Sequence, residues 1–306
     1  TSTRRSPKTQ GLSLNNAPLC QAPDRVPKKP SLSVCSNATD CHAHICGPQT
    51  LFPYISNRIY TPPDALLPDY QALLSRLGIE RAVLVQPSIY GTDNSALLAA
   101  LMTNTNRFRG VAVVDWEIAE GDLQSLHHCG VRGVRCNIVD LADAKGILPI
   151  EKLTYLANKI APLGWHIEFL MHVNEFPDLK QLLFNFPVPV VFGHLGYLKT
   201  NLGIADQGFQ NLLAMMREER AWVKLTGPYR ISAQHDLPYS DTQSFVDALL
   251  KANPKQIVWG SDWPHVMVKN KMPNDADLLD LLLSWVPDSP IRDQILRDNP
   301  QRLYTF

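Results

Sequence analysis

The stretch Thr39-Asp40-Cys41-His42-Ala43-His44-Ile45 carries an acid and two histidines at every second position. Alternate side chains of a β-strand share one face, so we expect Asp40, His42 and His44 to point the same way. Two adjacent imidazoles suit a metal ion or a bound anion. A polar strand end with two solvated histidines would show the same pattern, so the rest of the chain has to decide between the two.

Strand-like and helix-like stretches alternate from residue 38 onward. The predicted strands are short and rich in Val and Ile, as in strands buried on both faces, and they cover 38–45, 81–87, 109–115, 131–138, 166–171, 188–194, 221–227 and 256–262. The stretches with helical periodicity cover 68–77, 94–105, 120–128, 150–163, 177–185, 207–219, 241–252 and 275–285. This alternation predicts an α/β fold, a single (β/α)8 TIM barrel. A doubly wound open sheet is the alternative, but it needs a Gly-rich turn after its first strand, and none stands there.

The overall composition shows no bias toward a charged partner. The chain has 306 residues, and its 29 Lys and Arg balance its 29 Asp and Glu, so nothing favours nucleic acid or an acidic membrane. No apolar run reaches the ~18 residues that a membrane span needs. We therefore expect a small-molecule substrate, no nucleic-acid or membrane partner, and a monomer or homo-oligomer.

Residues 1–37 differ from the rest of the chain. They hold six Lys or Arg against one acid, Asp24, and show no helical or strand period. We expect a basic N-terminal arm or linker over 1–37 and a single barrel domain over 38–306. The six cysteines show no C-x-x-C spacing, which predicts reduced thiols and a cytoplasmic protein.

Polar residues stand at the C-terminal ends of most predicted strands, where the chemistry of a barrel collects. In chain order they are His42, His44, Ser88, Arg135, His172, His194, Arg230 and Asp262. A single strand-end histidine is more often a packed structural residue than a ligand. Four histidines, an aspartate and two arginines at corresponding strand ends are hard to explain by packing, so these ends predict an active site.

This order of residues resembles the amidohydrolase superfamily. His-x-His on the first strand, histidines on later strands and Asp on the last carry the likeness, and Asp298–Tyr304 resembles the closing helix of its amidohydrolase-2 branch. Within that branch the chain is similar to 2-pyrone-4,6-dicarboxylate lactonase and related lactonases. The matching stretches are 40–48, 52–54, 60–65, 91–94, 110–115, 133–135 and 259–265. The resemblance covers roughly residues 38–306.

The resemblance implies a hydrolase that opens the lactone ring of a small carboxylated or sulfonated substrate. Asp262 would be the general base for water, while His42, His44 and His194 would surround the carbonyl oxygen as donors or by holding a metal. The substrate-binding residues would be Tyr60, Ser88, Arg135 and Arg230. A decarboxylase or hydratase acting on an aromatic or unsaturated acid is the alternative within this branch. A catalytically inactive binding protein is a third alternative. Such a protein would be expected to have lost His42, His194 or Asp262, and all three are present.

Three departures from the dicarboxylate enzyme bear on the substrate. Asp140-Leu141 replaces a basic Lys-Arg pair, and Leu170 replaces a substrate-binding tyrosine. We therefore expect a lactone with fewer or differently placed anions, such as a sulfomuconolactone or a sugar-acid lactone. The third departure is His172, which stands where the dicarboxylate enzyme, which works without metal, has an acid.

The metal expectation follows from His172. No lysine ends the fourth strand, so the carbamylated-lysine binuclear site of other superfamily members is not expected. If Leu170 faces the lumen, His172 shares its face. One divalent metal, zinc, would then be held by His42, His44, His172 and Asp262. The alternative is an enzyme without metal.

Overall fold

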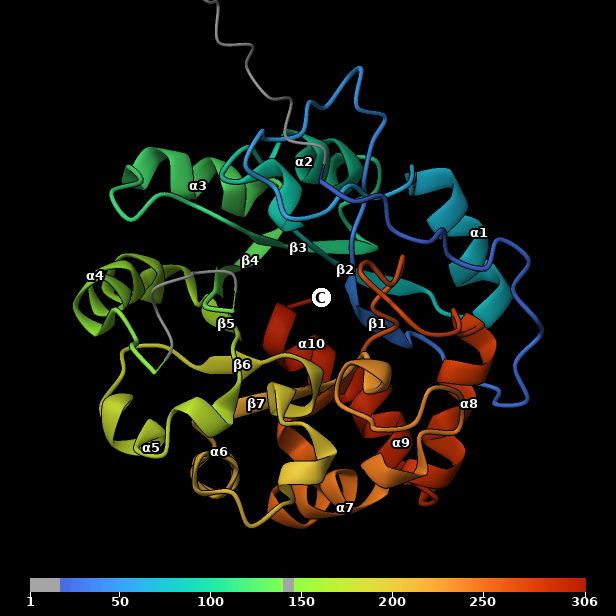
Figure 1. Ribbon diagram of the computed structural model, residues 1–306. Coiled ribbons are helices and arrows are strands. Elements are labelled where there is room, and N and C mark those ends of the chain that lie inside the picture. The colour runs from blue at the N-terminus through green and yellow to red at the C-terminus, as the bar shows by residue number, and fades with distance from the viewer. Residues whose placement is uncertain (1–16, 140–145) are drawn as a thin grey trace, which may run out of the picture.

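Eight parallel strands form a barrel with helices around it (Figure 1), which confirms the predicted TIM barrel. The structure, a computed structural model, describes residues 17–139 and 146–306. Neighbouring strands pair in chain order from β1 to β8. The strands are β1 Thr39–Ala43, β2 Arg81–Val85, β3 Phe108–Ala112, β4 Val131–Asn137, β5 His166–Leu170, β6 Val190–Phe192, β7 Ala221–Leu225 and β8 Ile257–Trp259.

The helices bury their apolar stripes against the outside of the barrel. In α1 (Leu67–Leu77), Pro68 lies in the first turn and Gly78 ends the helix at a φ of 75°. Its buried side chains are Tyr70, Leu73, Leu74 and Leu77. The others are α2 Ser95–Met102, α3 Glu120–His128, α4 Ile150–Ile160, α5 Leu179–Leu182, α6 Gln207–Arg217, α7 Gln243–Ala252, α8 Asp275–Trp285, α9 Ser289–Asp293 and α10 Asn299–Tyr304. The predicted helix over 177–185 is reduced to the single turn of α5.

The barrel closes between β1 and the segment after β8. Ala43 forms a parallel bridge with Trp263, and the Asp262 amide donates to the His42 carbonyl at 2.8 Å. The β1–β2 register shifts between Asp40 and Ala43, a bulge that changes which face the side chains take. The expectation that Asp40 shares a face with the histidines is wrong, because its carboxylate accepts from the hydroxyl of Tyr70 on the outer helix α1.

The C-terminal helix α10 closes the N-terminal end of the barrel and lies within the ring of strands in Figure 1. Tyr304 packs with buried Val, Cys and Trp side chains of six strands. The Arg109 guanidinium on β3 donates to the carbonyls of Tyr304 and Thr305, which end this helix. The lumen is therefore packed at this end, and only the opposite end can hold a site.

The described part of the N-terminal arm lies along the barrel. Leu19 bridges to Thr61, and the Lys28 ammonium pairs with Asp277 on α8 at 2.7 Å. The backbone amides of Ser31 and Leu32 donate to Asp280. All six cysteines are free thiols, as expected. In the parts of the chain that the structure describes, none of the helices has the length and apolarity that crossing a membrane requires.

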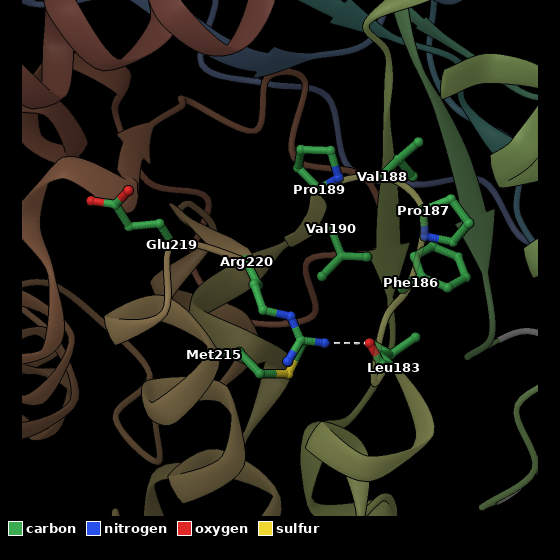
Figure 2. Close-up of a pocket in the computed structure, with 9 residues that line it drawn as sticks. All are labelled: Leu183, Phe186, Pro187, Val188, Pro189, Val190, Met215, Glu219 and Arg220. Carbon is green, nitrogen blue, oxygen red and sulfur yellow. Dashed lines mark hydrogen bonds between the residues drawn. The ribbon is translucent and has the colours of Figure 1, made fainter. Parts of the chain in front are cut away.

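A cavity of about 210 Å³ at the N-terminal ends of β6 and β7 is not the site (Figure 2). Its walls are mostly apolar, and its two charged side chains are Glu219 and Arg220. Arg220 is already engaged, since it donates to the Leu183 carbonyl and pairs with Glu218. No group of reactive side chains converges there, and this end of a barrel serves stability rather than chemistry.

Candidate active site

A second cavity, of about 130 Å³, opens at the C-terminal ends of the strands. It gathers side chains from seven of the eight strand ends and the loops that follow them, and from Tyr60 before α1. Its lining is His44, Tyr60, Ser88, Arg135, Asn137, Val139, Leu170, His194, Tyr197, Arg230, Asp262, Val266 and Met267. Seven of the predicted site residues therefore line one cavity, and His42 lies against it, with its ring centroid 4.9 Å from that of His44 and 5.4 Å from that of His194.

Asp262 is held as an ionised carboxylate with one oxygen engaged. Its Oδ2 accepts from the Tyr229 hydroxyl at 2.7 Å and from Arg230 Nε at 2.8 Å. Burial acts to raise the pKa of Asp262, but Arg230 and the three neighbouring histidines together outweigh it and hold this pKa well below its usual value. Oδ1 lies 3.7 Å from His42 Nε2, and neither atom has a hydrogen-bond partner among the described residues.

Two residues of the site hold strained backbone. Asp262 has a φ of 63° and His194 a φ of 48°, in the left-handed region. Such a conformation costs about 1–3 kcal/mol and collects at functional sites. Gly227, at a φ of 53°, lets both approach, because a Cβ there would lie 2.9 Å from Asp262 Oδ2 and 3.0 Å from His194 Nδ1.

The three lumen histidines are buried but differ in what their Nδ1 atoms meet. His44 Nδ1 lies 2.7 Å from the Val85 carbonyl oxygen, which can only accept, so Nδ1 carries the proton. His194 Nδ1 lies 2.8 Å from the Thr226 hydroxyl, which can donate or accept. Burial lowers the pKa of both histidines well below the usual value, so both are neutral.

His42 Nδ1 instead faces a buried ion pair. Lys224 Nζ on β7 lies 3.1 Å from this nitrogen, and Glu168 Oε1 on β5 lies 3.3 Å from it. Lys224 also pairs with Glu168 Oε2 at 2.7 Å. Burial acts to raise the pKa of Glu168, but Lys224 and His42 together bring it well below its usual value. Burial and Lys224 lower the pKa of His42, so this imidazole is neutral too.

The two arginines are free to different extents. Arg135 NH1 donates to the Gln86 carbonyl at 3.1 Å, while its buried Nε has no partner among the described residues. Arg230 gives Nε to Asp262 and NH2 to the Val266 carbonyl. Arg230 thus has fewer free N–H donors for a ligand than Arg135.

Tyr60 and Ser88 lie together on the cavity wall. Both line the cavity and hydrogen-bond to each other, and burial raises the pKa of the Tyr60 hydroxyl. Leu170 lines the same cavity, as expected if its side chain faces the lumen. Asp140 and Leu141 lie outside the described residues.

The residues that could hold a metal are His42, His194 and Asp262. Their ligand atoms lie within 4.8 Å of one another, and all three are buried. His44 lines the cavity beside them. His172 is not part of this group: its Nδ1 lies 2.9 Å from the Tyr197 carbonyl oxygen, and its ring packs on Tyr197. The geometry thus gathers His194 rather than His172.

Sequence reasoning missed Glu168, Lys224 and Tyr229. A signal for the first two was available, since each is the one charged residue inside a predicted buried strand. A fully buried charge is rare unless it is paired, so two such strands point to an ion pair in the lumen. Tyr229 follows β7 without a distinguishing pattern.

With this geometry in hand, comparison with known proteins decides the family. The amidohydrolase family profile matches residues 39–306. The chain belongs to the amidohydrolase family. It is 35% identical to the 2-pyrone-4,6-dicarboxylate hydrolase of Comamonas testosteroni over 91% of this chain and 93% of that protein. It is 36% identical to the 4-sulfomuconolactone hydrolase of Rhizobium radiobacter over 94% of this chain and 96% of that protein.

A solved structure shows the same architecture. A probable 2-pyrone-4,6-dicarboxylic acid hydrolase from Acinetobacter baumannii, crystallised with citric acid, matches with a TM-score of 0.79 at 27% identity, over 88% of this chain and all of that one. The predicted family resemblance is therefore confirmed. Both named sequence relatives are hydrolases whose names specify lactones bearing acidic groups.

Proposed function

We propose that this amidohydrolase opens the lactone ring of a small acidic compound by adding water. The observation that carries the proposal is the unpartnered Asp262 Oδ1, a buried ionised carboxylate oxygen beside His42 and His194 in a cavity that also holds Arg135 and Arg230. The names of the relatives supply the reaction class.

Each group has a role in that reaction. Arg135 binds an anionic group of the substrate, while Tyr60 and Ser88 position the ring. Asp262 Oδ1 takes a proton from the attacking water, and Tyr229 and Arg230 hold the carboxylate in place through Oδ2. Histidine N–H groups stabilise the carbonyl oxygen as it becomes negative. The proton on Asp262 then passes to the leaving ring oxygen.

The donor set at the strand ends also fits a divalent metal such as zinc. Two imidazoles and a carboxylate are common zinc ligands, and the orphaned His42 Nε2 and Asp262 Oδ1 lie on facing sides of the site. His42, His194 and Asp262 would hold the ion, with His44 next to them. When bound, a zinc ion would polarise the carbonyl group of the substrate.

The arginines favour a substrate with one strongly bound anion. A dicarboxylate would need two guanidinium groups with free N–H donors. Arg230 already donates Nε–H to Asp262 and an NH2 hydrogen to the Val266 carbonyl oxygen. Leu170 adds an apolar patch to the wall. We therefore favour a lactone with fewer or differently placed anions, such as a sulfomuconolactone or a sugar-acid lactone, over pyrone dicarboxylate.

A substrate panel tests this proposal. Purified protein is assayed with 2-pyrone-4,6-dicarboxylate, 4-sulfomuconolactone, muconolactone, aldonolactones and a set of aromatic acids, each with added Zn²⁺ and after chelation. Acid release in at least one assay supports a lactonase, whereas carbon dioxide release from an aromatic acid with no lactone opened would contradict it. Metal content of the fresh protein decides the zinc expectation separately.

We propose further that residues 38–306 form the catalytic barrel and that 1–37 form an arm lying on it. The contacts of Leu19 and Lys28 with the barrel support the arm. The six free thiols fit action in the cytoplasm.

A further inference from the structure

Lys224 lies fully buried inside the barrel, and its ammonium has three N–H donors and no acceptor. Three acceptors surround it: Glu168 Oε2 at 2.7 Å, the Cys41 carbonyl oxygen at 2.9 Å and His42 Nδ1 at 3.1 Å. Every donor is thus used if His42 Nδ1 accepts. A buried ammonium that loses one of these partners has no water to replace it, so the lost hydrogen bond is not compensated.

The two neutral forms of His42 can be compared by counting partners. With the proton on Nε2, Lys224 is satisfied, and the Nε2–H points toward the unpartnered Asp262 Oδ1 at 3.7 Å. With the proton on Nδ1, that N–H can reach Glu168 Oε1 at 3.3 Å, but it then faces an N–H of Lys224 at 3.1 Å. The first form places two acceptors, His42 Nδ1 and Glu168 Oε1, 3.3 Å apart, whereas the second places two N–H donors 3.1 Å apart. Only the first form gives all three donors of the buried Lys224 ammonium a partner.

We propose that Lys224 is a positioning residue that fixes His42 with its proton on Nε2, so that His42 presents an N–H to the site and holds a metal less tightly than it would without Lys224. In lactone opening this N–H would stabilise the carbonyl oxygen, and that part rests on the proposed function. The tautomer itself rests only on the contacts of Lys224 and Glu168.

The same pair also governs how tightly His42 could hold a metal. A histidine that binds a metal through Nε2 donates its Nδ1–H to a carboxylate or carbonyl oxygen, and such partners change metal affinity by about 10–100-fold. Glu168 Oε1 is placed for that role, and Lys224 competes with it for the same Nδ1 atom. Lys224 therefore sets the balance between proton donation and metal binding at His42.

The first test reads the tautomer of the wild-type protein. Two-bond ¹H–¹⁵N correlation spectra of metal-free protein distinguish an Nε2–H from an Nδ1–H imidazole, and the spectrum of His42→Gln identifies the His42 signals. We expect Nε2–H for His42 at neutral pH. An Nδ1–H or doubly protonated His42 overturns the proposal. No substrate is involved, so failure of the lactone panel does not affect this result.

The second test titrates zinc chloride calorimetrically into metal-free wild type, Lys224→Met and Lys224→Gln. Met keeps the length of the side chain without a donor, whereas the Gln amide can still donate to His42 Nδ1. We expect the Lys224→Met variant to bind zinc at least about tenfold more tightly than wild type, and Lys224→Gln to stay near wild type. An unchanged affinity in Lys224→Met, or an equal rise in both variants, overturns the proposal, since an equal rise reflects the loss of charge alone.

Discussion

His42 and His44 stand two residues apart at the end of one strand, yet their Nδ1 atoms meet groups of opposite character. His44 faces the Val85 carbonyl oxygen, an obligatory acceptor, at 2.7 Å. His42 faces the Lys224 ammonium, an obligatory donor, at 3.1 Å. His44 therefore keeps a lone pair on Nε2, whereas the contact with Lys224 favours a proton on Nε2 of His42.

This difference teaches that the His-x-His motif does not by itself assign a chemical role. The nitrogen that faces the site is controlled by the group behind the ring, and here the two groups come from β2 and β7. A donor and an acceptor then stand side by side, which suits a reaction that must both stabilise an oxygen and orient water.

The largest expected effect comes from removing the base that both histidines neighbour. Asp262→Asn preserves the size of the side chain but removes the carboxylate that accepts the proton of water. We expect kcat for lactone opening to fall by about 10³-fold or more, within the range for general bases. Circular dichroism confirms that the variant is folded. Turnover close to wild type in a folded variant would rule out Asp262 as the base.

The comparison itself is tested by truncating each histidine. His42→Leu removes the proposed N–H donor to the carbonyl oxygen, so we expect kcat without metal to fall by about 10²–10³-fold, as for a lost oxyanion donor. His44→Leu removes a lone pair and should cost less. Steady-state kinetics of the two chelated variants gives the ratio. A greater loss in His44→Leu would reverse the assignment of donor and acceptor.

A smaller effect, on the pH dependence of folding stability, tests whether His42 and His44 are both neutral in the folded protein. The pKa values of His42 and His44 are lowered in the folded state, so below pH 6.5 the unfolded chain binds more protons than the folded one. Folding stability is therefore full above about pH 7 and falls as the pH drops, by about 1 kcal/mol for each histidine at pH 5.5.

Replacing either histidine should reduce this loss. Urea unfolding of His42→Leu and of His44→Leu at pH 7.5 and 5.5 should each show a pH-dependent decrease about 1 kcal/mol smaller than in wild type. Equal effects in the two variants mean that both rings are neutral in the folded protein, so a difference in charge does not account for the contrast between them. A variant with the full wild-type decrease would mean that its missing histidine is charged in the folded protein.

The sequence predicted the barrel and most of the cavity wall, because strand ends of a barrel converge whatever the loops between them do. It placed Asp40 beside the histidines, which is wrong because one bulge in β1 turns Asp40 toward α1. It grouped His172 rather than His194 with the metal ligands, since spacing along the chain does not show which rings approach closely. The ion pair of Lys224 and Glu168 needs the closed barrel to bring β5 and β7 to His42.

The smallest expected effect extends the comparison to the third histidine. His194 Nδ1 faces the Thr226 hydroxyl at 2.8 Å, a group that both donates and accepts, so this contact leaves its tautomer open. Thr226→Val keeps the shape of the side chain and removes the hydroxyl from Nδ1 and from the His194 amide. We expect a destabilisation of about 1 kcal/mol in urea unfolding. Because no obligatory donor or acceptor is lost, kcat should fall only a few-fold. A fall as large as that of His42→Leu would show that Thr226 fixes His194 as firmly as Lys224 fixes His42, and the contrast between fixed and free imidazoles would then fail.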